Sequence, residues 1–242
     1  MFMKRSFLHG PVLIAAVVAA LQSSHGETLR EQLVAREAAG SGRVTPDVKT
    51  AFAAGIEAVK AAKIVEAAKQ VGDAAPDFTL KNATGKEVTL SKELKKGPVV
   101  LTWYRGGWCP YCNITMAAMQ KALPSIHEAG ATLLALTPEL PDKTLTTKEK
   151  NGLEFEVLTD LNHEVAEQYD ILFKLTPEVE VLYAKTMDLE AHNGAEAGTD
   201  TLPLAATYII GQDGTIVWAF LHHDYHMRAE PADIVAFLKG MK

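Results

Sequence analysis

Two cysteines, Cys109 and Cys112, are the residues of this chain whose type and spacing most clearly indicate chemistry. They follow an uninterrupted apolar run at 99–104 and precede a stretch of helical character at 113–128, so we expect them where a buried strand meets a helix start. Free N–H groups and the helix dipole lower the pKa of a thiol there, from about 8.5 toward neutrality. Residues three apart share a helix face, so the two sulfurs can meet and redox chemistry is predicted.

The roles of an arginine near the cysteine pair and of three histidines later in the sequence are open to more than one interpretation. Arg105 could add positive charge beside Cys109, or its side chain could point to solvent. His222, His223 and His226 could join the cysteines as zinc or copper ligands, or could simply line a surface loop. An inert structural disulfide is disfavoured, because so short a loop gains little entropic stabilisation. A helix start explains the thiols more simply than a metal does, so we expect no metal and no cofactor.

The elements that position these residues belong to a globular chain. It has 242 residues, of which 48% are hydrophobic and 22% are charged, values that fit neither a disordered chain nor a multi-span membrane protein. Its 24 Lys+Arg against 30 Asp+Glu give a net charge of −6, and no basic run of five residues occurs. A nucleic-acid partner is therefore not expected.

The amino-terminal segment has the pattern of an export signal. Lys4 and Arg5 precede an uncharged apolar run at 11–21, and small residues end the segment at Gly26. We interpret residues 1–26 as a signal peptide cleaved after Gly26, which predicts a periplasmic or secreted protein without stable membrane association. The alternative is an uncleaved signal that anchors the chain in a membrane.

Residues 27–70 are expected to form a helical extension, because this part is rich in Ala, Glu, Lys and Arg and lacks strand-like alternation. Thr45 and Pro46 have the pattern of a helix start. A mostly apolar stripe follows at helical spacing, formed by Val48, Phe52, Ile56, Val59 and Lys63. We expect this stripe to pack against the following domain; a contact in a homodimer is the alternative.

From Val71 to Lys242 short apolar runs alternate with helical stretches, which predicts an α/β domain with a mainly parallel sheet that ends in an antiparallel hairpin. The helix at 113–128 is expected to end at Gly130 and to break or kink near Pro124. The other expected elements are a hairpin at 78–80 and 88–90, strands at 131–136 and 155–158, helices at 143–151, 163–169, 177–186 and 230–239, a loop at 188–200, and the hairpin at 207–210 and 215–220.

Several segments of this domain resemble the alkyl hydroperoxide reductase and thiol-specific antioxidant (AhpC/TSA) family. They are 71–80, with Ala-Pro-Asp-Phe-Thr-Leu, 97–101, 104–112, with the cysteine pair, and the later pieces 134–138, 158–160 and 206–214. The resemblance covers about 71–242 and implies a peroxiredoxin domain with a thioredoxin-like fold, that is, a central mixed sheet flanked by helices. It also implies that Cys109 attacks a peroxide and that Cys112 is the partner thiol.

Two departures from the related patterns stand out. Counting back from the cysteine, Gly106 and Thr102 occupy the places of the threonine and proline in the common Pro-x-x-x-Thr-x-x-Cys pattern of peroxiredoxins. The hydroxyl that would hydrogen-bond the thiolate is missing, so we expect backbone N–H groups to replace it. Ala205 and Ala206 stand where thioredoxin-type reductases place a proline before the strand that faces the cysteines.

The leading hypothesis is a thiol peroxidase that reduces hydrogen peroxide or organic hydroperoxides. Cys109 forms a sulfenic acid, Cys112 captures it as a disulfide, and a thioredoxin-like dithiol reductant restores both thiols, with Arg105 supporting the thiolate. The alternatives are an exported thiol–disulfide oxidoreductase and, from another class, a copper-binding module without catalysis.

Overall fold

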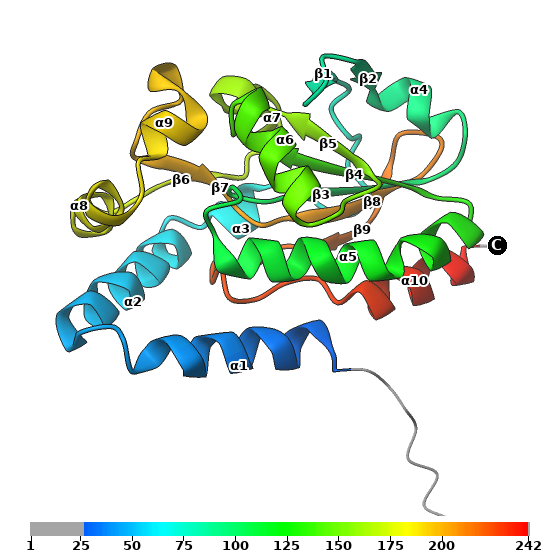
Figure 1. The fold of residues 1–242 in the computed structure, drawn as a ribbon. Coiled ribbons are helices and arrows are strands. Elements are labelled where there is room, and N and C mark those ends of the chain that lie inside the picture. Colours follow the sequence, from blue (N-terminus) through cyan, green and yellow to red (C-terminus); the bar gives the residue numbers. More distant parts are fainter. Residues whose placement is uncertain (1–26, 242) are drawn as a thin grey trace, which may run out of the picture.

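A seven-stranded sheet forms the centre of the computed structural model, which describes residues 27–241 (Figure 1). Its strand order is β2-β1-β5-β4-β3-β8-β9, and β6 and β7 form a separate two-stranded sheet. Only the β3–β4 and β4–β5 pairs are parallel, so the sheet is mixed, although less of it is parallel than the sequence pattern suggests. The strands are β1 Thr79–Asn82, β2 Glu87–Thr89, β3 Val99–Trp103, β4 Thr132–Thr137, β5 Glu156–Thr159, β6 Leu172–Lys174, β7 Thr201–Pro203, β8 Thr207–Ile210 and β9 Ile216–Phe220.

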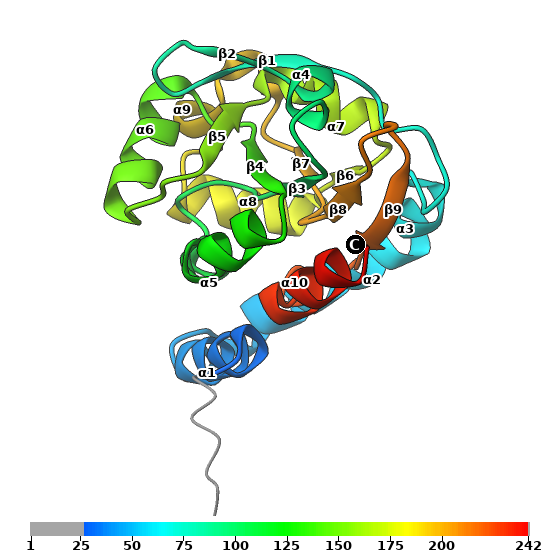
Figure 2. The same ribbon diagram turned by 90° about the vertical axis from the view of Figure 1, so that its right-hand side faces the viewer.

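Helices cover both faces of the sheet (Figure 1, Figure 2). Helices α5 and α10 pack on one face, whereas α4 and α7 contribute to the core on the other. The helices are α1 Leu29–Ser41, α2 Pro46–Ala61, α3 Ile64–Ala67, α4 Leu90–Leu94, α5 Pro110–Glu128, α6 Pro141–Lys150, α7 Glu164–Gln168, α8 Pro177–Thr186, α9 Leu189–Asn193 and α10 Pro231–Gly240, with 3₁₀ turns at Leu161–His163 and Ala195–Ala197.

Strand β3 is buried along its whole length, as its continuous apolar run predicts. Because successive side chains alternate, Leu101 and Trp103 enter the core beneath α4 and α7, whereas Val100 enters the core beneath α5. Strands β4 and β8 flank β3 and hold its carboxyl end in register. This central place in the sheet fixes the position from which the cysteine loop departs.

Some local expectations were wrong. Helix α5 passes through Pro124 without a break, because the buried neighbours Leu123 and Ile126 outweigh the hydrogen bond that proline removes. The expected loop at 188–200 contains α9, which begins where the Asp188 side chain accepts the N–H of Ala191 at 2.9 Å. Strands β6 and β7 and helix α4 were not expected.

The segment at 27–70 is helical and packs against the α/β part of the molecule. Helix α1 runs along α5, and α2 crosses to α8 (Figure 1). The apolar stripe of α2 faces this contact: Phe52 lies 5.7 Å from the ring of Tyr183 on α8, and Val59 is buried in the main core. The expected signal peptide at 1–26 lies outside the described residues. Within 27–241, no helix has the length and apolar character needed to span a bilayer.

Glu230 ties α1 to the start of α10. Its carboxylate accepts the N–H groups of Arg30 at 2.6 Å and of Leu29 at 3.3 Å, two donors that the first turn of α1 cannot satisfy internally. We expect Glu230→Ala to destabilise this contact by about 1 kcal/mol and to increase proteolytic cleavage between α1 and α2. Limited proteolysis followed by mass spectrometry tests this. Glu149→Ala, which truncates an exposed glutamate at the end of α6, is the matched control, and equal cleavage in both variants would contradict the assignment.

Candidate active site

Cys109 lies at the junction of the central strand and α5. A four-residue connection leads from Tyr104, whose N–H bonds the Leu136 carbonyl on β4, to Cys109, which is the N-cap of α5. The Cys109 sulfur accepts the backbone N–H of Cys112 at 3.4 Å. Both cysteines are fully buried thiols. The structure therefore places the pair at a helix start, and a backbone N–H takes the part of a missing hydroxyl, as expected from the sequence.

Arg105 points into the protein, toward the thiol. Its Nη2 lies 3.3 Å from the Cys109 sulfur, and its Nη1 donates to the hydroxyl of Tyr183 at 3.1 Å. The guanidinium also lies 4.2 Å from the ring centre of Tyr225 and 5.4 Å from that of Trp108. With only 3% of its surface exposed, Arg105 is held from three sides. The sequence left open whether Arg105 lies beside Cys109 or points to solvent; in the structure it lies beside Cys109.

Arg228 is a second buried arginine at the site, and sequence reasoning missed it. Its Nη2 lies 3.8 Å from the Cys112 sulfur, and its Nη1 donates to the carbonyl oxygens of Tyr225 and, at 2.9 Å, Met227. It belongs to the segment between β9 and α10, far from the cysteines in sequence. No local pattern marks it, because only the fold of the sheet brings that segment to the start of α5.

These charges set the protonation of the two thiols. Burial by itself raises the pKa of Cys109, but a hydrogen bond from the Cys112 thiol and the positive charges of Arg105 and Arg228 outweigh it, so that the pKa lies well below its ordinary value. The pKa of Cys112 is raised well above its ordinary value by burial and by its hydrogen bond to, and the charge of, the Cys109 thiolate. The surroundings of the pair therefore favour the thiolate form of Cys109 and the thiol form of Cys112.

The arginines need that thiolate. Among the described residues, neither arginine has a carboxylate within ion-pair distance. A buried guanidinium without a counter-ion is unfavourable, so a negative charge on Cys109 offsets part of the two positive charges. The electrostatics of the site therefore depend on one ionised sulfur.

Two glycines allow the loop before Cys109 to approach its neighbours closely. Gly106 has φ +149°, and a Cβ there would lie 2.2 Å from the indole nitrogen of Trp108. A Cβ on Gly107 would lie 2.0 Å from the Thr147 hydroxyl on α6. A threonine at position 106 has no room while Trp108 packs there. This contact is the physical reason for the glycine that departs from the common peroxiredoxin pattern.

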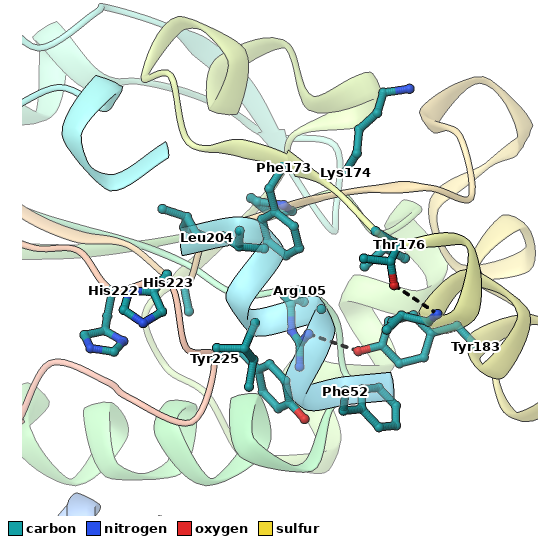
Figure 3. Close-up of a pocket in the computed structure, with 17 residues that line it drawn as sticks. Phe52, Arg105, Phe173, Lys174, Thr176, Tyr183, Leu204, His222, His223 and Tyr225 are labelled. Carbon is teal, nitrogen blue, oxygen red and sulfur yellow. Dashed lines mark hydrogen bonds between the residues drawn. The ribbon is translucent and has the colours of Figure 1, made fainter. Parts of the chain in front are cut away.

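The three histidines singled out in the sequence do not form a ligand set with the cysteines. His222 and His223 stack with their ring centres 4.4 Å apart, and His226 pairs with Asp224 at 2.7 Å. In the part of the chain that is described, no group of three or more His, Cys, Asp or Glu side chains is placed to hold a metal ion. His222 and His223 instead line a hollow beside Arg105 (Figure 3).

The mixed sheet, with a cysteine pair at the junction of a central strand and a helix, defines the thioredoxin fold. Residues 71–219 match the AhpC/TSA family model, and the chain belongs to the AhpC/TSA family. This confirms the resemblance and the fold that the sequence motifs predict.

Individual relatives support the same conclusion. The chain is 28% identical to peroxiredoxin Bcp of Escherichia coli over 102 residues, which are 42% of this chain and 65% of that protein. It is 31% identical to peroxiredoxin Bcp of Bacillus subtilis over 102 residues, which are 42% of this chain and 64% of that protein. The matches thus span less than two thirds of the length of these curated relatives, and residues 27–70 lie outside the family match.

Solved structures share the fold at low identity. Peroxidoxin BcpB from Mycobacterium tuberculosis aligns with a TM-score of 0.56 and 20% identity over 72% of this chain and 98% of its own. A Plasmodium vivax 2-Cys peroxiredoxin aligns with a TM-score of 0.55 and 18% identity over 72% of this chain and 82% of its own. These similarities establish the fold, and the chemistry of this chain has to be argued from its own site.

Proposed function

We propose that this protein is a thiol peroxidase in which Cys109 is the nucleophile. The Cys109 thiolate attacks the terminal oxygen of a hydroperoxide, an S–O bond forms as the O–O bond breaks, and the remaining oxygen leaves with a proton as water or an alcohol. Cys109 becomes a sulfenic acid. The observation that carries this proposal is a buried cysteine at a helix start whose sulfur accepts hydrogen bonds from Arg105 at 3.3 Å and from the Cys112 N–H at 3.4 Å.

Arg105 has a geometry suited to both stages of this step. In the resting site, its Nη2 donates to the sulfur at 3.3 Å and favours the thiolate. As the O–O bond breaks, negative charge moves from sulfur to the leaving oxygen, and a fixed buried guanidinium stabilises that charge without reorganisation. Tyr183 orients the guanidinium by accepting a hydrogen bond from its other terminal nitrogen, Nη1, at 3.1 Å (Figure 3).

Cys112 is proposed to resolve the sulfenic acid. Its sulfur attacks the sulfur of the Cys109 sulfenic acid, so that a disulfide forms and water leaves. Burial raises the pKa of the Cys112 thiol, and so do its hydrogen bond to Cys109 and the negative charge there; the charge disappears once the thiolate has become a neutral sulfenic acid. A thioredoxin-like dithiol then reduces the disulfide to two thiols and is itself oxidised. Oxidation of Cys109 thus removes one of the causes that keep Cys112 protonated.

A comparison of two activities tests the function. Purified protein is supplied with a dithiol donor and either hydrogen peroxide or an organic hydroperoxide, and the same preparation is assayed for reduction of insulin disulfides. We expect peroxide consumption at rates well above those of insulin reduction. Rapid insulin reduction with negligible peroxide turnover would instead support a thiol–disulfide oxidoreductase.

Replacing Cys112 with serine should separate the two steps. We expect one round of peroxide reduction followed by accumulation of sulfinic and sulfonic acid at Cys109, because no neighbouring thiol captures the sulfenic acid. Intact-protein mass spectrometry after stepwise peroxide addition measures this. Cys109→Ser treated in the same way is the control and should gain no oxygen at this site. An unchanged steady-state rate in Cys112→Ser would contradict the resolving role.

We further propose that the protein acts outside the cytoplasm, since residues 1–26 have the pattern of an export signal. Cell fractionation followed by mass analysis of the amino terminus tests this. A mature chain that begins at Glu27 in the periplasm or the medium is expected. An intact amino terminus in a membrane fraction would support the anchored alternative, and one in the cytoplasm would contradict export.

A further inference from the structure

Helix α2 of the amino-terminal segment forms one wall of the hollow that reaches Arg105 (Figure 3). Phe52, Ile56 and Val59 line it from α2, and Phe173, Val179 and Leu204 from the α/β part of the chain. The free space in it is about 30 Å³, room for about two water-sized molecules, so a small peroxide fits whereas a bulkier group must displace part of the lining. Of the described residues that line it, none carries a carboxylate side chain. The hollow is thus an apolar site with a guanidinium at its inner end.

A continuous series of contacts leads from this wall to the thiol. The ring of Phe52 packs on that of Tyr183 with centres 5.7 Å apart, the Tyr183 hydroxyl accepts from Arg105 at 3.1 Å, and Arg105 donates to Cys109 at 3.3 Å. Cys109 itself has no exposed surface. The hollow thus reaches Arg105, whose guanidinium is one hydrogen bond away from the buried sulfur.

The wall is closely fitted to the rest of the molecule. A Cβ added to Gly55 of α2 would lie 3.0 Å from a methyl group of Val179 on α8, so the two helices touch where they flank the hollow. Val59, one turn further along α2, is buried in the main core. A wall held at both of these points defines the width of the opening, since packed helices do not yield freely to a larger ligand.

From these contacts we infer that α2 is the specificity wall of the site, and that Phe52 and Ile56 determine the size of the hydroperoxide that reaches Cys109. The inference rests on the proposed peroxidase function and adds to it a role for residues outside the family match. Hydrogen peroxide is small enough for the free space between the walls, whereas the organic group of a bulky hydroperoxide must displace part of the α2 wall.

The test uses the ratio of two rates on the purified full-length protein. In the first pair, the rate of reaction with cumene hydroperoxide is divided by the rate with hydrogen peroxide, both measured by stopped-flow. In the second pair, the rate of alkylation of Cys109 by N-phenylmaleimide is divided by the rate with iodoacetamide, both measured by mass spectrometry. A change in the thiolate fraction of Cys109 alters the rates with the bulky and the small reagent by the same factor. The ratio of the two rates therefore reports how easily a bulky reagent reaches the sulfur. The alkylating agents are neutral and require no peroxidase activity, so they keep the two hypotheses separate.

Three variants complete the experiment. Phe52→Ala widens the opening and should raise the bulky-to-small ratio about tenfold, and Ile56→Trp fills it and should lower the ratio by a similar factor. Lys49→Ala, which truncates an exposed side chain of the same helix, should leave both ratios unchanged. Phe52→Leu replaces Phe52→Ala if circular dichroism shows that the alanine variant is unfolded.

Each outcome decides one hypothesis. Ratios that shift in opposite directions for the two wall variants support the inference. Ratios that stay constant in both overturn it, even if every variant consumes peroxide. If the alkylation ratio shifts but the protein does not consume peroxide, the role of α2 in controlling access to Cys109 is supported and the proposed peroxidase function is rejected.

Discussion

Cys109→Ser is expected to reduce peroxide consumption by more than about three orders of magnitude. A serine hydroxyl has a pKa far above that of a thiol, so even two neighbouring guanidinium groups leave it protonated at neutral pH. The substitution keeps the helix start intact, because a serine oxygen is a good N-cap and can accept the Cys112 N–H that the sulfur accepts now. The loss therefore reports chemistry rather than folding.

Initial rates with hydrogen peroxide and an organic hydroperoxide, at a fixed concentration of dithiol donor, measure this effect. Cys112→Ser is the matched control, since it removes the other sulfur of the pair and should retain the first turnover. Turnover of Cys109→Ser at more than a few per cent of the wild-type rate would refute the assignment of the nucleophile.

Arg105→Met should produce the second-largest loss, roughly 100-fold in the rate of peroxide reduction at neutral pH. Methionine approximates the length of the arginine stem but supplies neither the charge nor the hydrogen bond at 3.3 Å from the sulfur. Both contributions lower the pKa of Cys109, so their removal should raise it. Arg228 remains, which is why some activation should persist.

The pH dependence of Cys109 alkylation shows in which direction Arg105 shifts the pKa of the thiol. A thiolate forms as the pH rises through the pKa of the thiol, so the wild-type protein should react with iodoacetamide well below the pH at which an ordinary cysteine does. In Arg105→Met the midpoint should move to higher pH, and the difference between the two proteins should shrink in alkaline solution. Arg43→Met, at an exposed position, is the control. An unshifted midpoint in Arg105→Met would exclude this arginine from thiolate stabilisation.

Much of the fold was predictable because its signals are local. The continuous apolar run that becomes β3 and the turn residues of the β8–β9 hairpin each specify an element without reference to the rest of the chain. The elements that were missed, α4, α9, β6 and β7, have three to five residues each. Helices and strands of that length are decided by the neighbours they pack on, which a sequence pattern does not contain.

The residues of the site also differ in how far local sequence predicts them. The place of Cys109 and Cys112 follows from the strand and helix that flank them, whereas the direction of Arg105 depends on Tyr183, which lies 78 residues further along the chain. Arg228 lies 116 residues from Cys112, in a segment without periodicity. Gly106 could be recognised as unusual, but its cause, the indole of Trp108, becomes visible only in three dimensions.

Among the described residues, Arg105 and Arg228 have no carboxylate partner, and this has a consequence for the proposed redox cycle. In the proposed cycle, disulfide formation removes the negative charge on Cys109 and leaves Arg105 and Arg228 facing neutral sulfur in the protein interior. That electrostatic mismatch favours the dithiol over the disulfide, which corresponds to a strongly oxidising couple. Such a couple is readily reduced, which favours the return of the proposed disulfide to two thiols by a dithiol donor.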